Sequence, residues 1–318
     1  MPSMVASVFR ILLVPALVLT AALPSALAAR DRPVDEESAH WSQYLRSYLQ
    51  RVNEVDWRLS QAALPLCQQR IAGHGAVFDT LSAYDEDDRD GVSHALGLGN
   101  EPQVAATAQG SPASIANILP GDDLLAVNGA RLDEIHGKEL ASISGDETSA
   151  SLALLPTLQA STLTIRRGDA ERIVEVTPVE RCAIGTVLTV EERVDAYSDR
   201  HNVAITTGLL GFVRNEDELA LIIGHELAHV LLRDRHESMR TRAKRKEDEA
   251  DALGAQLAHC AGYDLRKAIG LWDRFDKTRA MAWLPSLTHR SSGQRQRQLA
   301  ELVTTLTCDR IGSVLDGV

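Results

Sequence analysis

The sequence predicts an α+β fold in which a mainly helical part and a β-rich part occupy separate stretches of the chain. Apolar residues recur at three- and four-residue steps over residues 35–70, which is typical of a helix. Short apolar segments separated by Gly- and Pro-containing turns fill residues 93–180, and long helical patterns return after residue 215. A chain of 318 residues is long enough for about two domains, each with its own hydrophobic core.

Composition and charge exclude one large class of function. The chain carries 33 Lys and Arg residues against 44 Asp and Glu, a formal net charge of −11, and 44% of its residues are hydrophobic. These values are typical of a globular protein. We expect no nucleic-acid partner, because binding phosphates requires a basic face and the 4% of aromatic residues leaves few side chains on which bases could stack.

The first 28 residues predict an export signal. An uncharged apolar run over residues 11–23 follows Arg10, and Ala26-Leu27-Ala28 then fits a small-x-small cleavage site. The run is shorter than the roughly 20 apolar residues that a membrane-spanning helix needs, although an uncleaved anchor is the alternative. We expect an exported protein, soluble after removal of residues 1–28, in a bacterial periplasm.

Export changes the interpretation of the four cysteines. Cys67, Cys182, Cys260 and Cys308 form no C-x-x-C pair, which excludes zinc-ribbon and dithiol redox motifs. In an oxidising compartment we expect two disulfide bonds, Cys67–Cys182 and Cys260–Cys308, because each then lies within one candidate folding unit. Buried free thiols are the alternative.

Strand and turn patterns define the β-rich part. Four short segments predict strands, at residues 104–108, 124–127, 162–166 and 172–177. Asn128-Gly129 between apolar stretches predicts a tight hairpin, because both turn positions need a positive φ.

The run from Gly110 to Gly129, G-S-P-A-S-I-A-N-I-L-P-G-D-D-L-L-A-V-N-G, resembles the core of bacterial PDZ domains. The resemblance implies a PDZ-like domain over residues 93–180 that binds an extended chain at a sheet edge and captures its terminal carboxylate. By the same resemblance, the carboxylate loop is Leu96, Gly97, Leu98 and Gly99. A small β-domain without a working groove is the alternative.

Residues 215–233, N-E-D-E-L-A-L-I-I-G-H-E-L-A-H-V-L-L-R, predict a helix that binds a metal. Asn215 is a good N-cap, and Glu218 completes a capping box. Within the helix, His225 and His229 lie one turn apart on one face and can bind the same zinc ion. Glu226 lies beside them and can act as the general base that polarises the attacking water.

A second helix supplies the third ligand that a catalytic zinc usually takes. Glu247 and Asp251 are four residues apart and share one face of this helix. Glu247 can bind the metal while Asp251 accepts the distal N–H of a liganding histidine. By chemistry alone Asp248 and Glu249 compete with Glu247, and an ordinary solvated helix start is the alternative. We expect one Zn²⁺ per chain.

Together, H-E-x-x-H at residues 225–229 and E-x-x-A-D at residues 247–251 resemble the signature of a zinc metallopeptidase family, peptidase family M48. This family includes HtpX, the CAAX-prenyl proteases and BepA-like enzymes. The resemblance implies a mainly helical zincin-type metalloprotease core with a small edge β-sheet over residues 183–318. Residues 35–72 would be its N-terminal helix, and the PDZ-like domain would be inserted between the two. A Cys67–Cys182 bridge would then join both ends of the insertion.

The resemblance also implies roles for residues outside the metal motifs. A strand that binds the substrate backbone would consist of Val203, Ala204, Ile205 and Thr206. His289 would stabilise the oxyanion or approach the zinc, and Arg295 would position Glu247 or the substrate. The residue after His289 is Arg290, where the family usually has proline.

A basic stretch lies between the two metal motifs. Its members are Arg233, Arg235, Arg240, Arg242, Lys244, Arg245 and Lys246. It is either a lid or docking strip for acidic substrates or lipid headgroups, or a solvated helix face. The sequence therefore leaves a peripheral membrane contact open, and it leaves the oligomeric state open as well.

From these patterns we expect an exported zinc-dependent metalloendopeptidase that cleaves proteins or peptides. The resemblance implies a role in envelope protein quality control, with the PDZ-like domain selecting substrates. The alternative is a PDZ adaptor or chaperone-like binding protein. In that case the zinc site would be structural, or a fourth ligand such as His289 would keep it closed.

Overall fold

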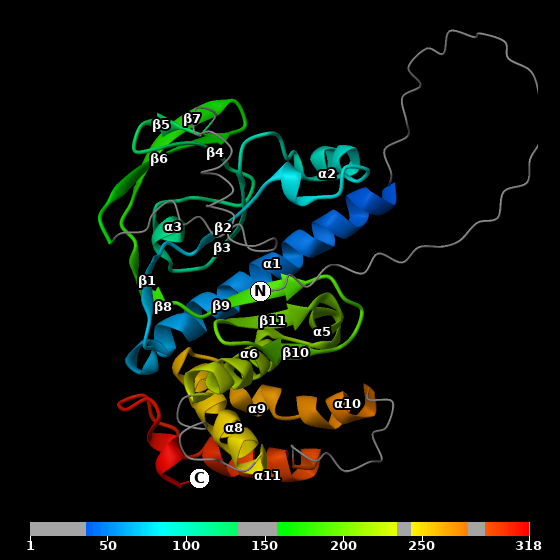
Figure 1. Cartoon of the computed structure of the whole chain (residues 1–318), viewed down its shortest axis with the longest axis vertical. Helices are drawn as coiled ribbons and strands as arrows, with labels where there is room; N and C mark the ends of the chain where they lie inside the picture. The colour runs from blue at the N-terminus through cyan, green and yellow to red at the C-terminus, as the bar shows by residue number, and fades with distance from the viewer. Residues whose placement is uncertain (1–35, 133–157, 234–242, 279–289, 318) are drawn as a thin grey trace, which may run out of the picture. The chain divides into compact units, whose positions relative to one another are not determined.

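The computed structural model describes residues 36–132, 158–233, 243–278 and 290–317, all within a unit that spans Val34–Val318 (Figure 1). The predicted signal peptide, residues 1–28, and His289 lie outside the described residues. The described chain mixes helices with antiparallel and parallel strands, which confirms the α+β prediction.

The predicted N-terminal helix forms as α1 (Glu36–Ala62). Its buried residues Val52, Val55 and Leu59 recur at three- and four-residue steps and so lie on one face. The α-helix ends before residue 70 because Pro65 has no N–H to continue the α-helical hydrogen bonds, and the chain continues as the short 3₁₀ helix η1 (Leu64–Leu66). Helix α1 contacts both helix α6 (Glu216–Leu231) of the helical part and strand β3 (Gln103–Thr107) of the larger sheet (Figure 1).

A six-stranded antiparallel sheet forms the β-rich part. Along the sheet, the order is β2 (Ala76–Asp79), β3 (Gln103–Thr107), β4 (Asp123–Val127), β6 (Ser161–Arg167) and β7 (Ala170–Val176), with β5 (Ala130–Arg131) paired to β4. The four predicted strands are confirmed. Asn128 and Gly129 adopt φ values of 50° and 81°, which confirms the tight hairpin between β4 and β5.

Strand β2 lies before the predicted boundary at residue 93, and no alternating pattern marked it. Two helices flank β3 in the sequence, α2 (Arg89–Leu96) and α3 (Pro112–Ile115). The sheet has its own apolar core, which includes Val104, Leu124 and Ile165.

Strands β1 (Arg70–Gly73) and β8 (Val179–Cys182) pair antiparallel where the chain enters and leaves the segment that carries this sheet. The Cys67–Cys182 disulfide closes the same place, and the Cys260–Cys308 disulfide joins the end of helix α8 (Ala243–Cys260) to the C-terminal segment. Both predicted pairings are confirmed, and the described residues contain no free cysteine.

A three-stranded sheet precedes the metal-binding helix. Its order is β10 (Ala196–Ser198), β11 (Asn202–Thr206) and β9 (Gly185–Thr189). Strand β11 is the central strand, antiparallel to β10 and parallel to β9. The short helix α5 (Thr207–Phe212) follows β11, and the Thr206 side chain caps it by accepting a hydrogen bond from the Leu209 N–H.

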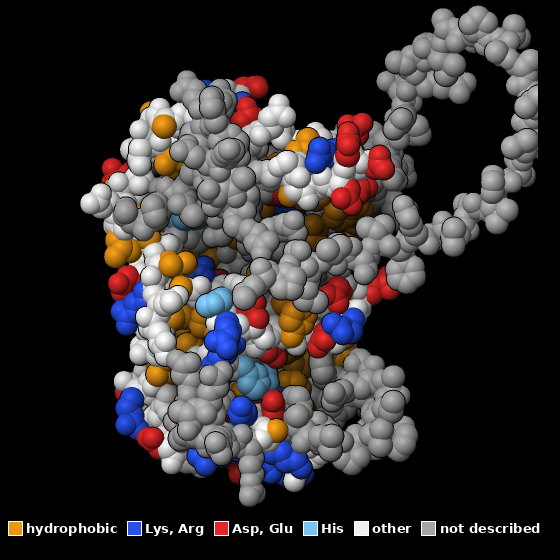
Figure 2. All heavy atoms as spheres, viewed as in Figure 1, with side chains coloured by type: hydrophobic (Ala, Val, Ile, Leu, Met, Phe, Trp, Pro, Cys, Tyr) orange, Lys and Arg blue, Asp and Glu red, His pale blue; other side chains and the backbone are white. Residues whose placement is uncertain are grey.

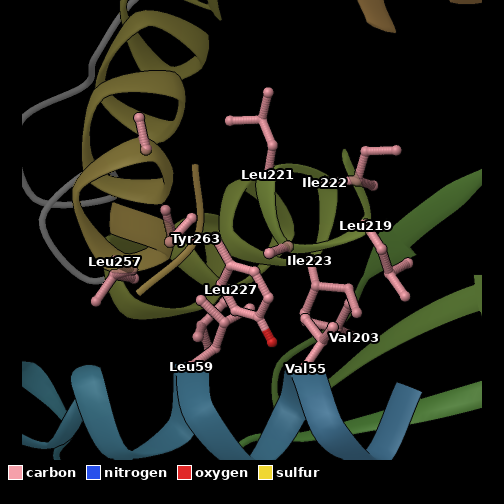
Figure 3. Close-up of a cluster of buried hydrophobic side chains, with 14 of the residues drawn as sticks. Val55, Leu59, Val203, Leu219, Leu221, Ile222, Ile223, Leu227, Leu257 and Tyr263 are labelled. Atoms are coloured by element: carbon pink, nitrogen blue, oxygen red, sulfur yellow. The ribbon is translucent and has the colours of Figure 1, made fainter. Parts of the chain in front are cut away.

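The remaining helices form the helical part. They are α6 (Glu216–Leu231), α8 (Ala243–Cys260), α9 (Leu265–Ala268), α10 (Leu271–Thr278), α11 (Ser292–Leu302) and the 3₁₀ helix η3 (Ser313–Gly317). Figure 3 shows Val55 and Leu59 of α1 pointing toward Ile223 and Leu227 of α6 in the buried cluster that holds this part together.

Two glycines bring α6 and α8 into backbone contact. A Cβ on Gly224 would lie 2.7 Å from the Gly254 carbonyl oxygen, and a Cβ on Gly254 would lie 2.6 Å from the His225 nitrogen. No side chain fits at either position without moving a helix. The close approach therefore depends on glycine in both helices, directly beside His225 of the metal motif.

On the face drawn in Figure 2, acidic and basic side chains are interspersed over the described surface, with hydrophobic side chains between them. None of the described helices combines the length and the hydropathy that crossing a bilayer requires.

Candidate metal centre

Helix α6 begins where the sequence predicts. The Asn215 side chain accepts a hydrogen bond from the Glu218 N–H at 2.9 Å. The Glu218 carboxylate accepts from the Arg214 N–H rather than from the N–H of Asn215, so the capping box forms only in part. Arg274 of α10 also binds Glu218, which leaves this buried carboxylate fully engaged in holding the start of the helix.

Three potential ligand atoms converge between α6 and α8. The Nε2 atoms of His225 and His229 lie 3.1 Å apart, and Oε2 of Glu247 lies 3.5 Å from each of them. Among the described residues, no other group of three or more His, Cys, Asp or Glu side chains is arranged so that it could hold a metal ion. Two imidazole nitrogens and one carboxylate oxygen are a typical donor set for zinc, so the residues fit this ion.

The orientation of His225 is set by Asp251. Oδ1 of Asp251 lies 2.8 Å from Nδ1 of His225, so this N–H donates a hydrogen bond to the carboxylate and Nε2 faces the other two ligand atoms. Burial lowers the pKa of His225, but hydrogen bonds to Asp251 and Glu247 outweigh it and raise the pKa to about 9. Without a metal, a proton on Nε2 is thus stabilised at the place where a cation would bind.

Arg295 of α11 holds Asp251 from the other side. Its guanidinium donates to both carboxylate oxygens, with 2.7 Å between Nε and Oδ2, and stacks 3.5 Å from the centre of the Trp272 ring. Burial raises the pKa of Asp251, but the charge of Arg295 and the hydrogen bond from His225 hold it well below its usual range. The partner of Arg295 among the described residues is therefore Asp251, and the role toward Glu247 or the substrate that the resemblance implied stays a prediction.

The competing carboxylates of α8 are engaged elsewhere. Asp248 accepts two hydrogen bonds from Arg290, with 2.6 Å between Nη2 and Oδ2. Glu249 is fully buried and accepts from Arg245 at 2.9 Å. These pairings leave Glu247 as the carboxylate that faces the histidines. They also give a structural role to Arg290, the position at which the sequence departs from the family pattern.

The general-base candidate faces the three-stranded sheet. Oε2 of Glu226 accepts a hydrogen bond from the Ser198 hydroxyl at 2.9 Å. Ser198 is the last residue of β10, and no motif in the sequence singled it out. Its contact with Glu226 spans 28 residues of sequence, so neither helical nor strand periodicity could reveal it.

The predicted substrate strand, Val203 to Thr206, is β11. Because β11 pairs with β10 on one side and β9 on the other, its backbone groups already bond within the sheet. An extended chain needs an unpaired edge to add to a sheet. No described strand pairs with the other side of β10, so the open edge near Glu226 belongs to β10 rather than to β11.

The predicted carboxylate loop follows α2. Leu96 is the last residue of this helix, Gly97 caps it with a φ of 63°, and Leu98 is fully buried beside Tyr84 and Val92. The Gly97 carbonyl accepts a hydrogen bond from the Gln103 side chain. The loop therefore leads into β3, an inner strand, whereas β2 is at the edge of the sheet.

Arg235, Arg240 and Arg242 of the basic stretch lie outside the described residues. Two of its members within them bind the protein itself. Arg233 donates to the Asp199 carbonyl in the turn between β10 and β11, and Arg245 pairs with Glu249. Because these two arginines bind groups of the protein itself, they favour the interpretation of the basic stretch as a helix face over that of a docking strip.

Comparison with known proteins supports the metal motif. Residues 183–245 match the family model of peptidase family M48, which covers the three-stranded sheet and α6. A search of curated proteins found no relative with a significant match. The family match and the converging ligand atoms together support a metallopeptidase that acts on proteins or peptides.

Proposed function

We propose that this protein is an exported zinc-dependent metalloendopeptidase that cleaves extended segments of proteins or peptides. One observation carries the proposal: His225, His229 and Glu247 converge within hydrogen-bonding distance of one another, and Glu226 follows His225 on α6. The match of residues 183–245 to peptidase family M48 supports the same chemistry.

In this proposal, His225, His229 and Glu247 would hold the zinc ion. When bound, zinc supplies Lewis-acid polarisation of the scissile carbonyl and of the attacking water. The Glu226 carboxylate accepts the proton that this water loses and delivers it to the leaving amine nitrogen. Asp251 keeps His225 in the tautomer that directs Nε2 toward the site, and Arg295 keeps Asp251 ionised.

The edge of β10 would align the substrate. In an antiparallel pair, residues alternately point their backbone groups toward and away from the partner strand. The Thr206 N–H donates to the Asp195 carbonyl, and the Asp199 N–H donates to the Asn202 carbonyl. By alternation, the backbone N–H and C=O of Ser198 point to the open edge, where an extended chain can bind.

The six-stranded sheet would select or deliver substrate chains as a PDZ-like domain. The support is the resemblance of residues 110–129 together with the open edge of β2. The two disulfide bonds support an oxidising compartment, in line with export to the periplasm, and the family resemblance alone suggests a role in envelope quality control.

The substitution Glu226→Gln tests the activity. We expect the variant to retain one zinc per chain and to cleave casein at least about 10³-fold more slowly, because it removes the base but none of the ligands. Zinc content and casein cleavage are measured on the protein without residues 1–28. Glu301→Gln on the exposed face of α11 is the matched control and should cleave as the wild type does.

The adaptor alternative predicts a different result. A structural or closed metal site would give bound zinc without proteolysis that a chelator abolishes and added zinc restores. Wild-type protein that binds zinc but leaves casein intact would therefore contradict the proposed activity.

A further inference from the structure

The geometry points to Ser198 as a positioning residue that fixes the general base relative to the substrate strand. This inference rests on the proposed peptidase activity and deepens it. Its starting point is the 2.9 Å hydrogen bond from the Ser198 hydroxyl to Oε2 of Glu226, which joins β10 to α6. No other hydrogen bond to the Glu226 carboxylate is found among the described residues.

One oxygen of Glu226 is thus held, and the other remains for the attacking water. Glu226 is only partly buried, and a glutamate side chain has three rotatable bonds, so it would otherwise sample several orientations. A hydroxyl donor is suited to this task, because it binds the ionised carboxylate without bringing a competing charge. The bond therefore favours the orientation in which Glu226 can accept a proton.

The backbone of the same residue faces the proposed substrate. Ser198 pairs with Val203, and the flanking pairs carry the hydrogen bonds, so the backbone groups of Ser198 point to the open edge of β10. At the neighbouring position the edge is partly closed, because the Asp195 carboxylate accepts from the Ala196 N–H. A chain added to β10 would therefore bind at Ser198, whose side chain holds the base.

Ser198 consequently links two requirements of peptide cleavage in one residue. Its backbone sets the register of an extended substrate, and its hydroxyl sets the direction of the carboxylate that takes the proton. Loss of the hydroxyl should leave substrate pairing intact, since pairing uses main-chain atoms, and should slow the chemical step. This separation between binding and turnover is the signature that the inference predicts.

The test compares Ser198→Ala with Ser198→Thr. We expect Ser198→Ala to lower kcat about tenfold and to change KM less than about twofold, whereas Ser198→Thr restores most of kcat because it keeps the hydroxyl. Zinc content should stay at the wild-type value in both variants. The matched control is Ser47→Ala, which removes an exposed hydroxyl on α1 that bonds only to the Tyr44 carbonyl.

A second readout needs neither zinc nor turnover. In crystals of the zinc-free Ser198→Ala variant, the Glu226 side chain should occupy more than one rotamer, whereas the Thr variant should keep one. A wild-type kcat in Ser198→Ala, or a raised KM with unchanged kcat, would overturn the inference while the proposed activity stands. Absence of chelator-sensitive cleavage by the wild-type protein would overturn the proposed activity and this inference with it.

Discussion

The α6–α8 helix pair and the six-stranded sheet both contain buried charged side chains, but they arrange them differently. In the sheet, charged groups form closed pairs: Arg167 binds both oxygens of Asp122, and Arg166 binds Asp123. Between α6 and α8, the nitrogen atoms of two histidines and a carboxylate oxygen are directed at one point.

The difference indicates where the chemistry lies. A closed ion pair satisfies its members and fixes two strands, whereas three ligand atoms that meet at one point gain most from a bound cation. The network that surrounds this point, from Trp272 through Arg295 and Asp251 to His225, orients a ligand rather than joining strands. The helix pair therefore has the arrangement of a candidate metal site, whereas the charged groups of the sheet stabilise it.

The largest effect is expected from Glu247→Ala. Removing one of three ligands should abolish stoichiometric zinc binding at micromolar metal and lower casein cleavage by at least about 10³-fold. The matched change in the sheet is Glu101→Ala, which removes a half-exposed partner of Arg166 and should alter neither quantity. Mass spectrometry measures the zinc content of both variants, and casein digestion measures their activity. Full zinc occupancy in Glu247→Ala would refute this ligand set.

A smaller effect is expected from Arg295→Met. It leaves Asp251 buried without its cationic partner, so the free energy of unfolding should fall by about 3–5 kcal/mol. Arg167→Met is the counterpart in the sheet, where the arginine is about one-quarter exposed and Asp122 keeps its hydrogen bond from the Leu119 N–H. Urea unfolding measures the stability of both variants. Equal losses of unfolding free energy in Arg295→Met and Arg167→Met would contradict the distinction between the two regions.

The smallest effect concerns Tyr84, which donates a 2.6 Å hydrogen bond to Asp79 beneath the sheet. Burial and the nearby Asp79 charge raise the pKa of Tyr84 above its usual value of 10.0. A raised folded-state pKa adds stability that is fully present below pH 10 and is lost as the pH rises further. Tyr84→Phe should therefore cost about 1–2 kcal/mol at pH 7 and flatten the stability profile above pH 10.

Tyr44→Phe is the control for this measurement, because Tyr44 is 53% exposed. Stability is measured by urea unfolding between pH 7 and pH 11. A profile that keeps its alkaline slope in Tyr84→Phe would show that another group is responsible.

Features that depend on neighbouring residues could be predicted from the sequence. The four-residue spacing of His225 and His229, the Asn215 cap and the Asn128-Gly129 hairpin all follow from local backbone geometry, and the structure has each of them. Both disulfide pairings also follow once folding units are assigned.

Features that join distant segments could not be predicted in this way. The contact between Arg295 and Asp251 spans 44 residues, and the one between Ser198 and Glu226 spans 28. The resemblance assigned substrate binding to residues 203–206, which form β11, but strand order depends on which segments pair in space, and β10 takes an outer position. No periodicity within one element contains this information.

The sequence by itself determined the ligand types, their spacing along two helices and the strands of the sheet, because these depend on side-chain chemistry and local backbone preference. Only the tertiary structure decided that Asp251 receives Arg295, that Ser198 holds Glu226 and that β10 has the open edge. These relations depend on helix packing and on strand pairing, both of which bring together residues that lie far apart in the chain.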